Sequence, residues 1–116
     1  MAYIYYSGVF SYKHNIKALD WALKAYGDGN YDPKGEVANL LGKLYFGASG
    51  IKTDYKKAYN YFLKSSNNRN IDSYYYLGLC HLNGWGTKKD SINARKFLKA
   101  AADKGHVEAT QKLKEL

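Results

Sequence analysis

The sequence is poor in the residues that form covalent cross-links and metal sites. Its 116 residues include a single cysteine, Cys80, and a single proline. One cysteine excludes an internal disulfide and fits a reducing compartment, so we expect a cytoplasmic protein. No His-x-x-x-His pattern and no pair of cysteines provides metal-ligand spacing. We therefore expect no metal, and no motif indicates a cofactor.

Long apolar runs are missing as well. No stretch approaches the roughly 18 to 20 apolar residues of a transmembrane helix, so we expect no membrane partner. The first ten residues, MAYIYYSGVF, lack the basic segment followed by an aliphatic one that marks a secretory signal. With 46% hydrophobic and 24% charged residues, the composition predicts one small globular domain with one modest core.

Acidic residues are in short supply. There are 10 Asp and Glu against 18 Lys and Arg, and the resulting net charge of +8 favours an acidic partner through long-range steering. The 13 tyrosines suit binding surfaces, because each offers a large, stiff contact area with one polar tip.

Nucleic-acid binding through lysines is an alternative to a protein partner. Lysines alternate with aromatic residues in DYKKAYNYFLK (54–64), a pattern that suits contacts with phosphates and bases. Against it, Arg69 and Arg95 are the only arginines in the sequence. Arginine is the side chain best suited to bidentate phosphate and base contacts.

The chain contains an internal repeat. LGKLYFGASGIKTD (41–54) aligns without a gap on LGLCHLNGWGTKKD (77–90). Around both copies, apolar or small residues recur at i, i+3, i+4 and i+7, which is one stripe of a helix. Each unit is therefore predicted to be two amphipathic helices joined by a glycine-bearing turn. We expect a short turn or helix at 2–7, followed by helices at 15–26, 33–46, 54–66, 71–83, 90–104 and 107–116.

The glycines of the repeat have structural explanations. Gly84 and Gly86 follow the last residues of a helix, where glycine adopts left-handed dihedral angles at little cost. Their loop lacks the third glycine of Gly-x-Gly-x-x-Gly and the Gly-Lys-Ser/Thr of a P-loop, so it does not predict phosphate binding. Gly42 and Gly78 lie inside helices, where glycine costs about 1 kcal/mol relative to alanine. We expect a neighbouring helix to approach both of them closely.

Most carboxylates are expected to cap helices or to stand alone on the surface. Asp54 and Asp90 immediately precede or begin predicted helices and suit N-capping. Asp32 and Pro33 are expected to be the cap and the first residue of the helix that follows them. Three further carboxylates are expected to be lone surface charges: Asp20, Asp72 and Glu108.

The repeat resembles the Sel-1-like repeat family, a relative of the tetratricopeptide repeat. The family pattern of Leu-Gly-x-x-Tyr, a glycine-bearing turn, an Asp and a Lys-Ala helix with aromatic residues is visible in LLGKLYFGASGIKTDYKKAYNYFLKSS (40–66). The resemblance implies an all-α fold, a short right-handed α-solenoid of about six helices with two full helix-turn-helix repeats flanked by half repeats. Residues 1–116 would then form one domain, with a half repeat at 1–35, repeats at 36–71 and 72–107, and a C-terminal capping helix at 107–116.

The resemblance also implies a function. Stacked helix pairs produce a curved surface with a concave wall, and in tetratricopeptide relatives the first helix of each unit lines that wall. We therefore expect a non-enzymatic protein–protein interaction module that binds a partner protein through its concave face. The small size and the excess positive charge favour a narrower form, a small inhibitor or immunity protein that neutralises an acidic toxin domain. The aromatic N-terminus makes a homodimer a further alternative. The candidate contact residues are Asn39, Lys43, Phe46, Tyr75, Leu79, Leu82, Trp85, Gln111 and Lys112.

No set of residues points to catalysis. Cys80 and His81 are neighbours on a predicted helix, so their side chains point about 100° apart and cannot form a nucleophile–base pair. We expect Cys80 to be a small buried residue, His81 to fill the tyrosine position of the repeat, and His106 to be a structural turn residue. Secreted members of the family that bind or slowly hydrolyse β-lactams are disulfide-rich, whereas this sequence has one cysteine. The resemblance therefore does not carry that activity over, and a weak hydrolase is retained only as the less favoured alternative.

Overall fold

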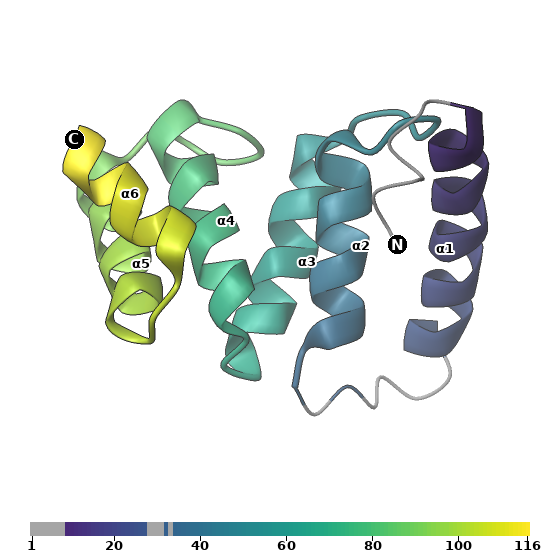
Figure 1. Ribbon diagram of the computed structural model, residues 1–116, viewed down its shortest axis with the longest axis horizontal. Coiled ribbons are helices and arrows are strands. Elements are labelled where there is room, and N and C mark those ends of the chain that lie inside the picture. Colours follow the sequence, from purple (N-terminus) through teal and green to yellow (C-terminus); the bar gives the residue numbers. More distant parts are fainter. Residues whose placement is uncertain (1–8, 28–31, 33) are drawn as a thin grey trace.

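The described part of the chain folds into six helices and no strand. The computed structural model describes residues 9–27, 32 and 34–116, and the turn or helix expected at 2–7 lies outside them. The helices are α1 (Val9–Gly27), α2 (Glu36–Gly47), α3 (Tyr55–Asn67), α4 (Ile71–Asn83), α5 (Ser91–Asp103) and α6 (Val107–Glu115) (Figure 1). The predicted all-α fold is confirmed. The first helix begins earlier than expected, because nothing in VFSYKH (9–14) interrupts it.

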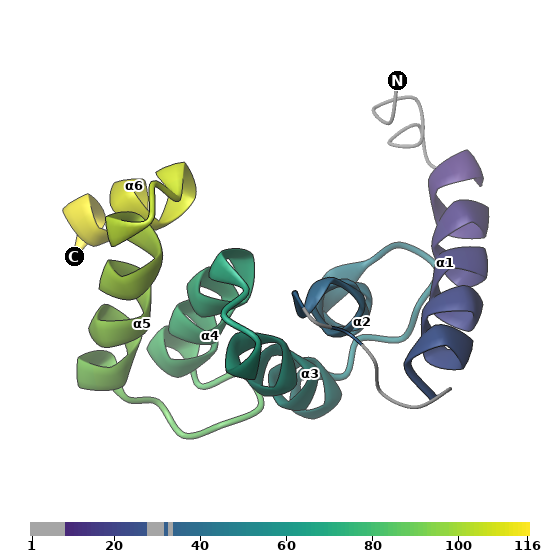
Figure 2. The same ribbon diagram turned by 90° about the horizontal axis from the view of Figure 1, so that it is seen from below.

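The helices stack in chain order along an arc. Each helix packs against the next one, from α1 on α2 to α5 on α6. Figure 2 shows α1 and α6 at the two ends of the arc, with α2 and α4 towards its inner side and α3 on its outer side. The pairs α2–α3 and α4–α5 are the two helical hairpins of the repeat. The helices that open successive units, α2, α4 and α6, therefore line the concave face. Within residues 9–27, 32 and 34–116, no helix has both the length and the apolarity needed for a bilayer crossing.

Side-chain caps explain where several helices begin. Asp54 accepts a hydrogen bond from the backbone N–H of Lys57 at 3.1 Å. Asp90 accepts from the backbone N–H groups two and three residues ahead, each at 3.1 Å. Both predicted caps are confirmed, and each satisfies backbone donors that the first turn of a helix leaves free. Asn70 caps α4 in the same way, at 3.1 Å from the backbone nitrogen of Ser73.

The start of α2 differs from the prediction. Asp32 does accept hydrogen bonds from the backbone N–H groups of Val37 (3.1 Å) and Ala38 (2.9 Å). The helix nevertheless begins later than expected, because Gly35 adopts a left-handed conformation with φ of 68° and separates the aspartate from the first turn. Pro33, expected as the first helical residue, lies outside the described residues.

The core lies between the facing stripes of the helices. Its larger, completely buried apolar side chains are Leu41, Phe62, Leu77 and Leu98. A Cβ added to Gly42 would lie 2.5 Å from the ring of Phe62, and one added to Gly78 would lie 2.6 Å from Leu98. The close approach expected at both glycines is therefore confirmed.

The glycine turn after α4 also has the predicted conformation. Gly84 and Gly86 have φ values of 73° and 74°, in the left-handed region that glycine adopts without steric cost. A Cβ on Gly86 would in addition collide with the backbone carbonyl of Tyr55. The turn between α4 and α5 therefore packs directly onto the start of α3.

Candidate functional site

A single carboxylate joins the three helices that line the concave face. Asp72, in the first turn of α4, accepts hydrogen bonds at Oδ2 from Asn39 Nδ2 (2.9 Å) and Lys43 Nζ (3.3 Å), both on α2. Its Oδ1 accepts a hydrogen bond from His106 Nε2 (3.0 Å), and His106 is the cap of α6. These four residues form what we call the Asp72 junction. The expectation that Asp72 is a lone surface charge is wrong, because the solenoid brings partners 29 to 34 positions away to it.

The junction holds His106 in one tautomer. The backbone N–H of Ala109 donates to Nδ1 of His106 at 3.1 Å. The lone pair is therefore on Nδ1 and the proton on Nε2, which donates to Asp72. The imidazole also stacks on Tyr75, with ring centroids 4.8 Å apart and planes 25° apart. The structural role predicted for His106 is confirmed, and its ring fixes Tyr75 beside it.

The hydrogen bonds of the junction favour the ionised form of Asp72. Burial alone would raise the pKa of this carboxyl, but the hydrogen bonds from His106 and Asn39 and the charge of Lys43 outweigh it. The pKa of Asp72 therefore lies below its ordinary value of 3.8. Because the folded pKa is the lower one, the junction stabilises the fold above the unfolded pKa. That contribution is lost as the pH falls through the folded pKa.

Replacing Asp72 by asparagine should destabilise the protein at neutral pH by about 1 kcal/mol, since the group is partly exposed and its charge–charge attraction is screened. The difference from the wild type should shrink as the pH falls below about 4. Urea denaturation followed by circular dichroism at several pH values measures both effects. Asp20→Asn, which removes an exposed i, i+4 pair with Lys24, is the matched control and should change little. If the difference in unfolding free energy between the wild type and Asp72→Asn stays constant down to acidic pH, the charge of Asp72 does not stabilise the junction.

A shallow cavity lies on the concave face between α4 and α6. It has a volume of about 340 Å³ and combines apolar, hydrogen-bonding and charged side chains of both signs. Val107 is an apolar residue with 75% of its surface exposed, and Lys112 Nζ lies 3.5 Å from Glu115 Oε1. We call this cavity the α4–α6 groove. Its lining residues are Tyr75, Val107, Glu108, Gln111, Lys112 and Glu115.

Tyr75 provides the groove with a neutral phenol. Partial burial, followed by the negative charges of Glu108, Asp72 and Glu115, raises the pKa of Tyr75 above its ordinary value of 10.0. The hydroxyl therefore keeps its proton at physiological pH and can donate a hydrogen bond as well as accept one. A ring held by stacking and carrying one polar tip is suited to contact with a peptide or protein surface.

The structure brings some of the predicted contact residues together. Tyr75, Gln111 and Lys112 line the α4–α6 groove. Asn39 and Lys43 lie beside Asp72. The side chain of Lys43 is exposed, whereas only 7% of the surface of Asn39 is accessible to solvent. Two further candidates, Leu79 and Leu82, are half-buried on α4.

Phe46 and Trp85 are placed elsewhere. Their rings meet edge to face with centroids 5.3 Å apart, and Trp85 stacks on Tyr55 at 5.1 Å. Phe46 also contacts the rings of Phe62 and Tyr76, at 5.9 and 5.4 Å. The described contacts of both residues are with other parts of this chain. They support the packing of α2, α3 and the α4–α5 turn, and they do not line the α4–α6 groove.

Sequence reasoning missed several residues of this face. The sequence predicts Asp72 and Glu108 as lone surface charges, and Val107, Glu108 and Glu115, which line the groove, are not among the predicted contact residues. The sequence does contain one signal for these four residues: all of them lie on helices that open a repeat unit and are therefore expected to line the concave face. That signal does not say which of these side chains meet, because their partners come from other repeats.

Cys80 and His81 pack in different directions. Cys80 is completely buried, as predicted, and burial raises the pKa of its thiol to about 12. The thiol is therefore protonated at neutral pH and is a poor nucleophile. His81 Nε2 lies 3.2 Å from the hydroxyl of Tyr59 on α3, and its ring stacks on Phe97 at 5.6 Å. In the part of the chain that the structure describes, no cluster of three His, Cys, Asp or Glu residues could hold a metal ion.

Relatives of the chain share its repeat. The HRD3B component of an ERAD-associated E3 ubiquitin-protein ligase from Arabidopsis thaliana is 36% identical over 92 residues, which are 78% of this chain and 13% of that protein. An uncharacterised protein of Neisseria meningitidis serogroup B is 31% identical over 108 residues, which are 93% of this chain and 22% of that protein. The chain thus spans less than a quarter of the length of either relative.

Solved structures show the same fold. A Sel1 repeat protein from Oxalobacter formigenes superposes with a TM-score of 0.70 at 21% identity, covering 88% of this chain and 44% of that one. Helicobacter pylori cysteine-rich protein B superposes with a TM-score of 0.61 at 21% identity, covering 87% of this chain and 90% of that one. The family model named Sel1 repeat matches residues 1–30, 35–70 and 71–106. The chain therefore belongs to the Sel1 repeat family, whose repeats form protein–protein interaction modules and whose members are in general non-enzymatic scaffolds.

Proposed function

We propose that this chain is a non-enzymatic module that binds a segment of a partner protein on its concave face. The observation that carries the proposal is the α4–α6 groove, where exposed Val107 lies with Tyr75 and Gln111 around one cavity. Tyrosine is enriched at interface hot spots, and apolar surface bordered by polar groups is the usual anatomy of a protein interface. The net charge alone would not point to this place, because the groove carries charges of both signs.

The Asp72 junction supports this proposal by ordering the groove before a partner arrives. Tyr75 is stacked on His106, and His106 is held by Asp72 and by the backbone of α6. A side chain that is already ordered loses less conformational entropy on binding, so more of its contact energy appears as affinity.

The test is affinity capture from a lysate of the native host, washed at about 0.15 M and then 0.5 M salt. We expect one protein to be retained at near-equal stoichiometry through the second wash. Val107→Asp should abolish that retention, because it replaces the exposed apolar side chain of the groove by a charge. Ile92→Asp is the matched control, since Ile92 is 82% exposed in the first turn of α5, outside the groove.

Two results would contradict binding of a partner protein in the α4–α6 groove. Equal capture by the wild type and Val107→Asp would place the contact outside the groove. Nucleic acid released by salt, with no protein retained, would instead make lysine-driven nucleic-acid binding the function.

A narrower form of the proposal concerns the partner. The net charge of +8 supports an acidic protein, and the single buried thiol of Cys80 fits a cytoplasmic location. In this form the chain is an inhibitor or immunity protein, and co-expression with the captured protein should relieve its toxicity. A captured protein that is harmless when expressed alone would remove the immunity role and leave the binding module in place.

Homodimerisation through the aromatic N-terminus is a separate alternative. The segment concerned, residues 1–8, lies outside the described residues. Light scattering of the purified protein measures its mass directly, and a monomer at micromolar concentration would exclude this alternative.

A further inference from the structure

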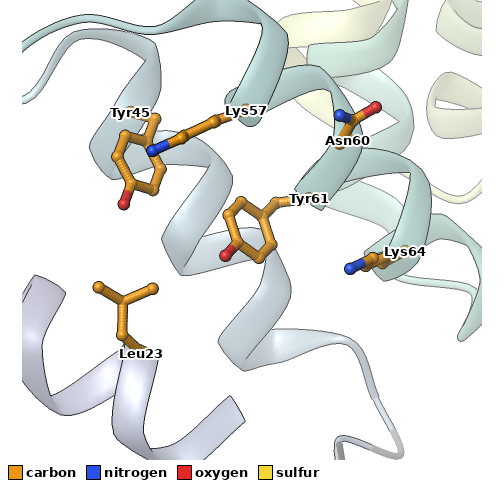
Figure 3. A pocket seen from close by; sticks show the side chains of 6 residues that line it. All are labelled: Leu23, Tyr45, Lys57, Asn60, Tyr61 and Lys64. Carbon is orange, nitrogen blue, oxygen red and sulfur yellow. The ribbon is translucent and has the colours of Figure 1, made fainter. Parts of the chain in front are cut away.

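A second cavity lies away from the α4–α6 groove, between α1, α2 and α3. It has a volume of about 430 Å³ and contains none of the predicted contact residues. Figure 3 shows Leu23 of α1 facing the rings of Tyr45 and Tyr61, with Lys57 and Lys64 at its two ends. Its lining residues are Leu23, Tyr45, Lys57, Asn60, Tyr61 and Lys64, and we call it the tyrosine–lysine pocket.

The charge of this pocket is positive. Two lysines line it and no carboxylate does. Lys24, Lys43 and Lys112 lie within 3.5 Å of a carboxylate oxygen, whereas the other described lysines form no ion pair. Lys57 and Lys64 have no such partner among the described residues. The pocket therefore presents two ammonium groups that are not neutralised by described carboxylates.

Aromatic rings hold both lysines in place. Lys57 Nζ lies 5.2 Å from the ring centroid of Tyr45, and Lys64 Nζ lies 5.4 and 5.6 Å from those of Tyr26 and Tyr61. These are cation–π distances. The rings of Tyr45 and Tyr61 are themselves parallel within 4°, with centroids 5.9 Å apart. The two cations are therefore positioned at the ends of an aromatic wall.

The distance between the two lysines of the pocket is set by their positions on one face of α3. Lys57, Asn60, Tyr61 and Lys64 occupy positions i, i+3, i+4 and i+7 of α3. Two turns separate the lysines, which corresponds to about 10 Å along the helix axis. The ring of Tyr61 is only half-buried and faces the pocket. Burial, with smaller effects from Tyr45 and Tyr26, raises the pKa of Tyr61 above 10.0, so its hydroxyl stays protonated.

We propose that the tyrosine–lysine pocket binds an acidic amphipathic helix of a protein partner. Two carboxylates seven residues apart on that helix meet Lys57 and Lys64, since they are also separated by two turns. An apolar side chain between them lies against Tyr45, Tyr61 and Leu23. An amphipathic helix laid into a groove is an established mode of peptide recognition. This site is independent of the α4–α6 groove, so either can fail without the other.

The composition of the pocket favours such a helix over nucleic acid. Its cations are lysines, which interact as point charges, and no arginine lines it. The two rings are stacked on each other and carry the cations over their faces. Their faces are therefore partly occupied and less available for stacking with a base.

The test uses a fluorescently labelled, alanine-rich helical peptide with two glutamates seven residues apart and a phenylalanine between them. Fluorescence anisotropy measures its affinity for the full chain. Lys57→Ala/Lys64→Ala should weaken binding by about tenfold or more. Lys56→Ala/Lys96→Ala removes the same charge from two exposed helical positions outside the pocket, and should weaken binding by less than about twofold. Circular dichroism verifies that both double variants stay folded.

Further measurements separate the remaining outcomes. A peptide with glutamines in place of the glutamates should bind much more weakly, and titration with the acidic peptide should shift the NMR signals of the Tyr45 and Tyr61 rings. Equal losses in the two double variants, or no binding by the wild type, would overturn the proposal. Tighter binding of a thymidine oligonucleotide that depends on Lys57 and Lys64 would overturn it in favour of nucleic acid.

Discussion

Replacing Phe62 by alanine is expected to lower the free energy of unfolding by about 3–5 kcal/mol. Phe62 is completely buried, stacks on Tyr76 with centroids 4.9 Å apart, and contacts Phe46 edge to face. Its ring also fills the space opposite Gly42. Truncation removes the apolar area and leaves a cavity between α2, α3 and α4 that their backbones cannot fully close.

Urea denaturation followed by circular dichroism measures this loss. Because a domain of this size has a total stability of about 5–15 kcal/mol, the melting temperature should fall by more than about 10 °C. Since each helix of the solenoid packs mainly on its neighbours, the loss should also uncouple α2 from α4 and broaden the transition. Ile92→Ala, at a side chain that is 82% exposed, is the control and should change stability by less than about 0.5 kcal/mol. A similar effect for both variants would contradict the packing described for Phe62.

Gly42→Ala is expected to destabilise the protein by about 1–2 kcal/mol, although alanine is the better helix former. Helix propensity alone favours the change by about 1 kcal/mol. The added Cβ would lie 2.5 Å from the ring of Phe62, which cannot retreat because Tyr76 is stacked on it. Overpacking of a dense core costs about 1–3 kcal/mol, and this steric cost exceeds the gain in propensity.

Gly47→Ala separates helix propensity from overpacking, because it replaces another glycine of the same helix. Gly47 is the last residue of α2, and a Cβ added there meets no atom within 4 Å. This variant should be neutral or slightly stabilised in thermal and urea denaturation. Combining Gly42→Ala with Phe62→Leu should cost less than the sum of the two single changes, because the smaller side chain makes room for the Cβ. Strict additivity would show that Gly42 and Phe62 do not interact.

Much of the fold was predictable because its signals are local. Asp54 and Asp90 lie within three residues of the backbone groups that they cap, so their spacing in the sequence is enough to assign them. The expected bounds of α4 agree with the structure residue by residue. The start of α2 was misplaced, since the left-handed conformation of Gly35 delays the helix. Nothing in the sequence marks that glycine as different from a helical one.

The candidate binding surfaces are less predictable from the sequence. Tyr75, Gln111 and Lys112 were expected on the concave wall and do line one groove, because they lie on helices that open a repeat unit. Phe46 and Trp85 have the same apolar signal, but they pack against each other and do not line that groove, and Trp85 also stacks on Tyr55. An aromatic residue off the core stripe can serve a partner or a neighbouring helix, and the pattern is identical in both cases.

The sequence by itself determined the repeat, the order of the helices, the caps Asp54 and Asp90, and the glycines at which helices meet, since each depends on spacings of a few residues. Only the tertiary structure decided that Asp72 joins α2, α4 and α6. It also decided that Lys57 and Lys64 lie at the two ends of a pocket formed by α3 with residues of α1 and α2. These sites depend on stacking between successive units, which brings together side chains from different repeats. Periodicity specifies which side of a helix is buried, whereas the packed neighbours decide which side chains meet there.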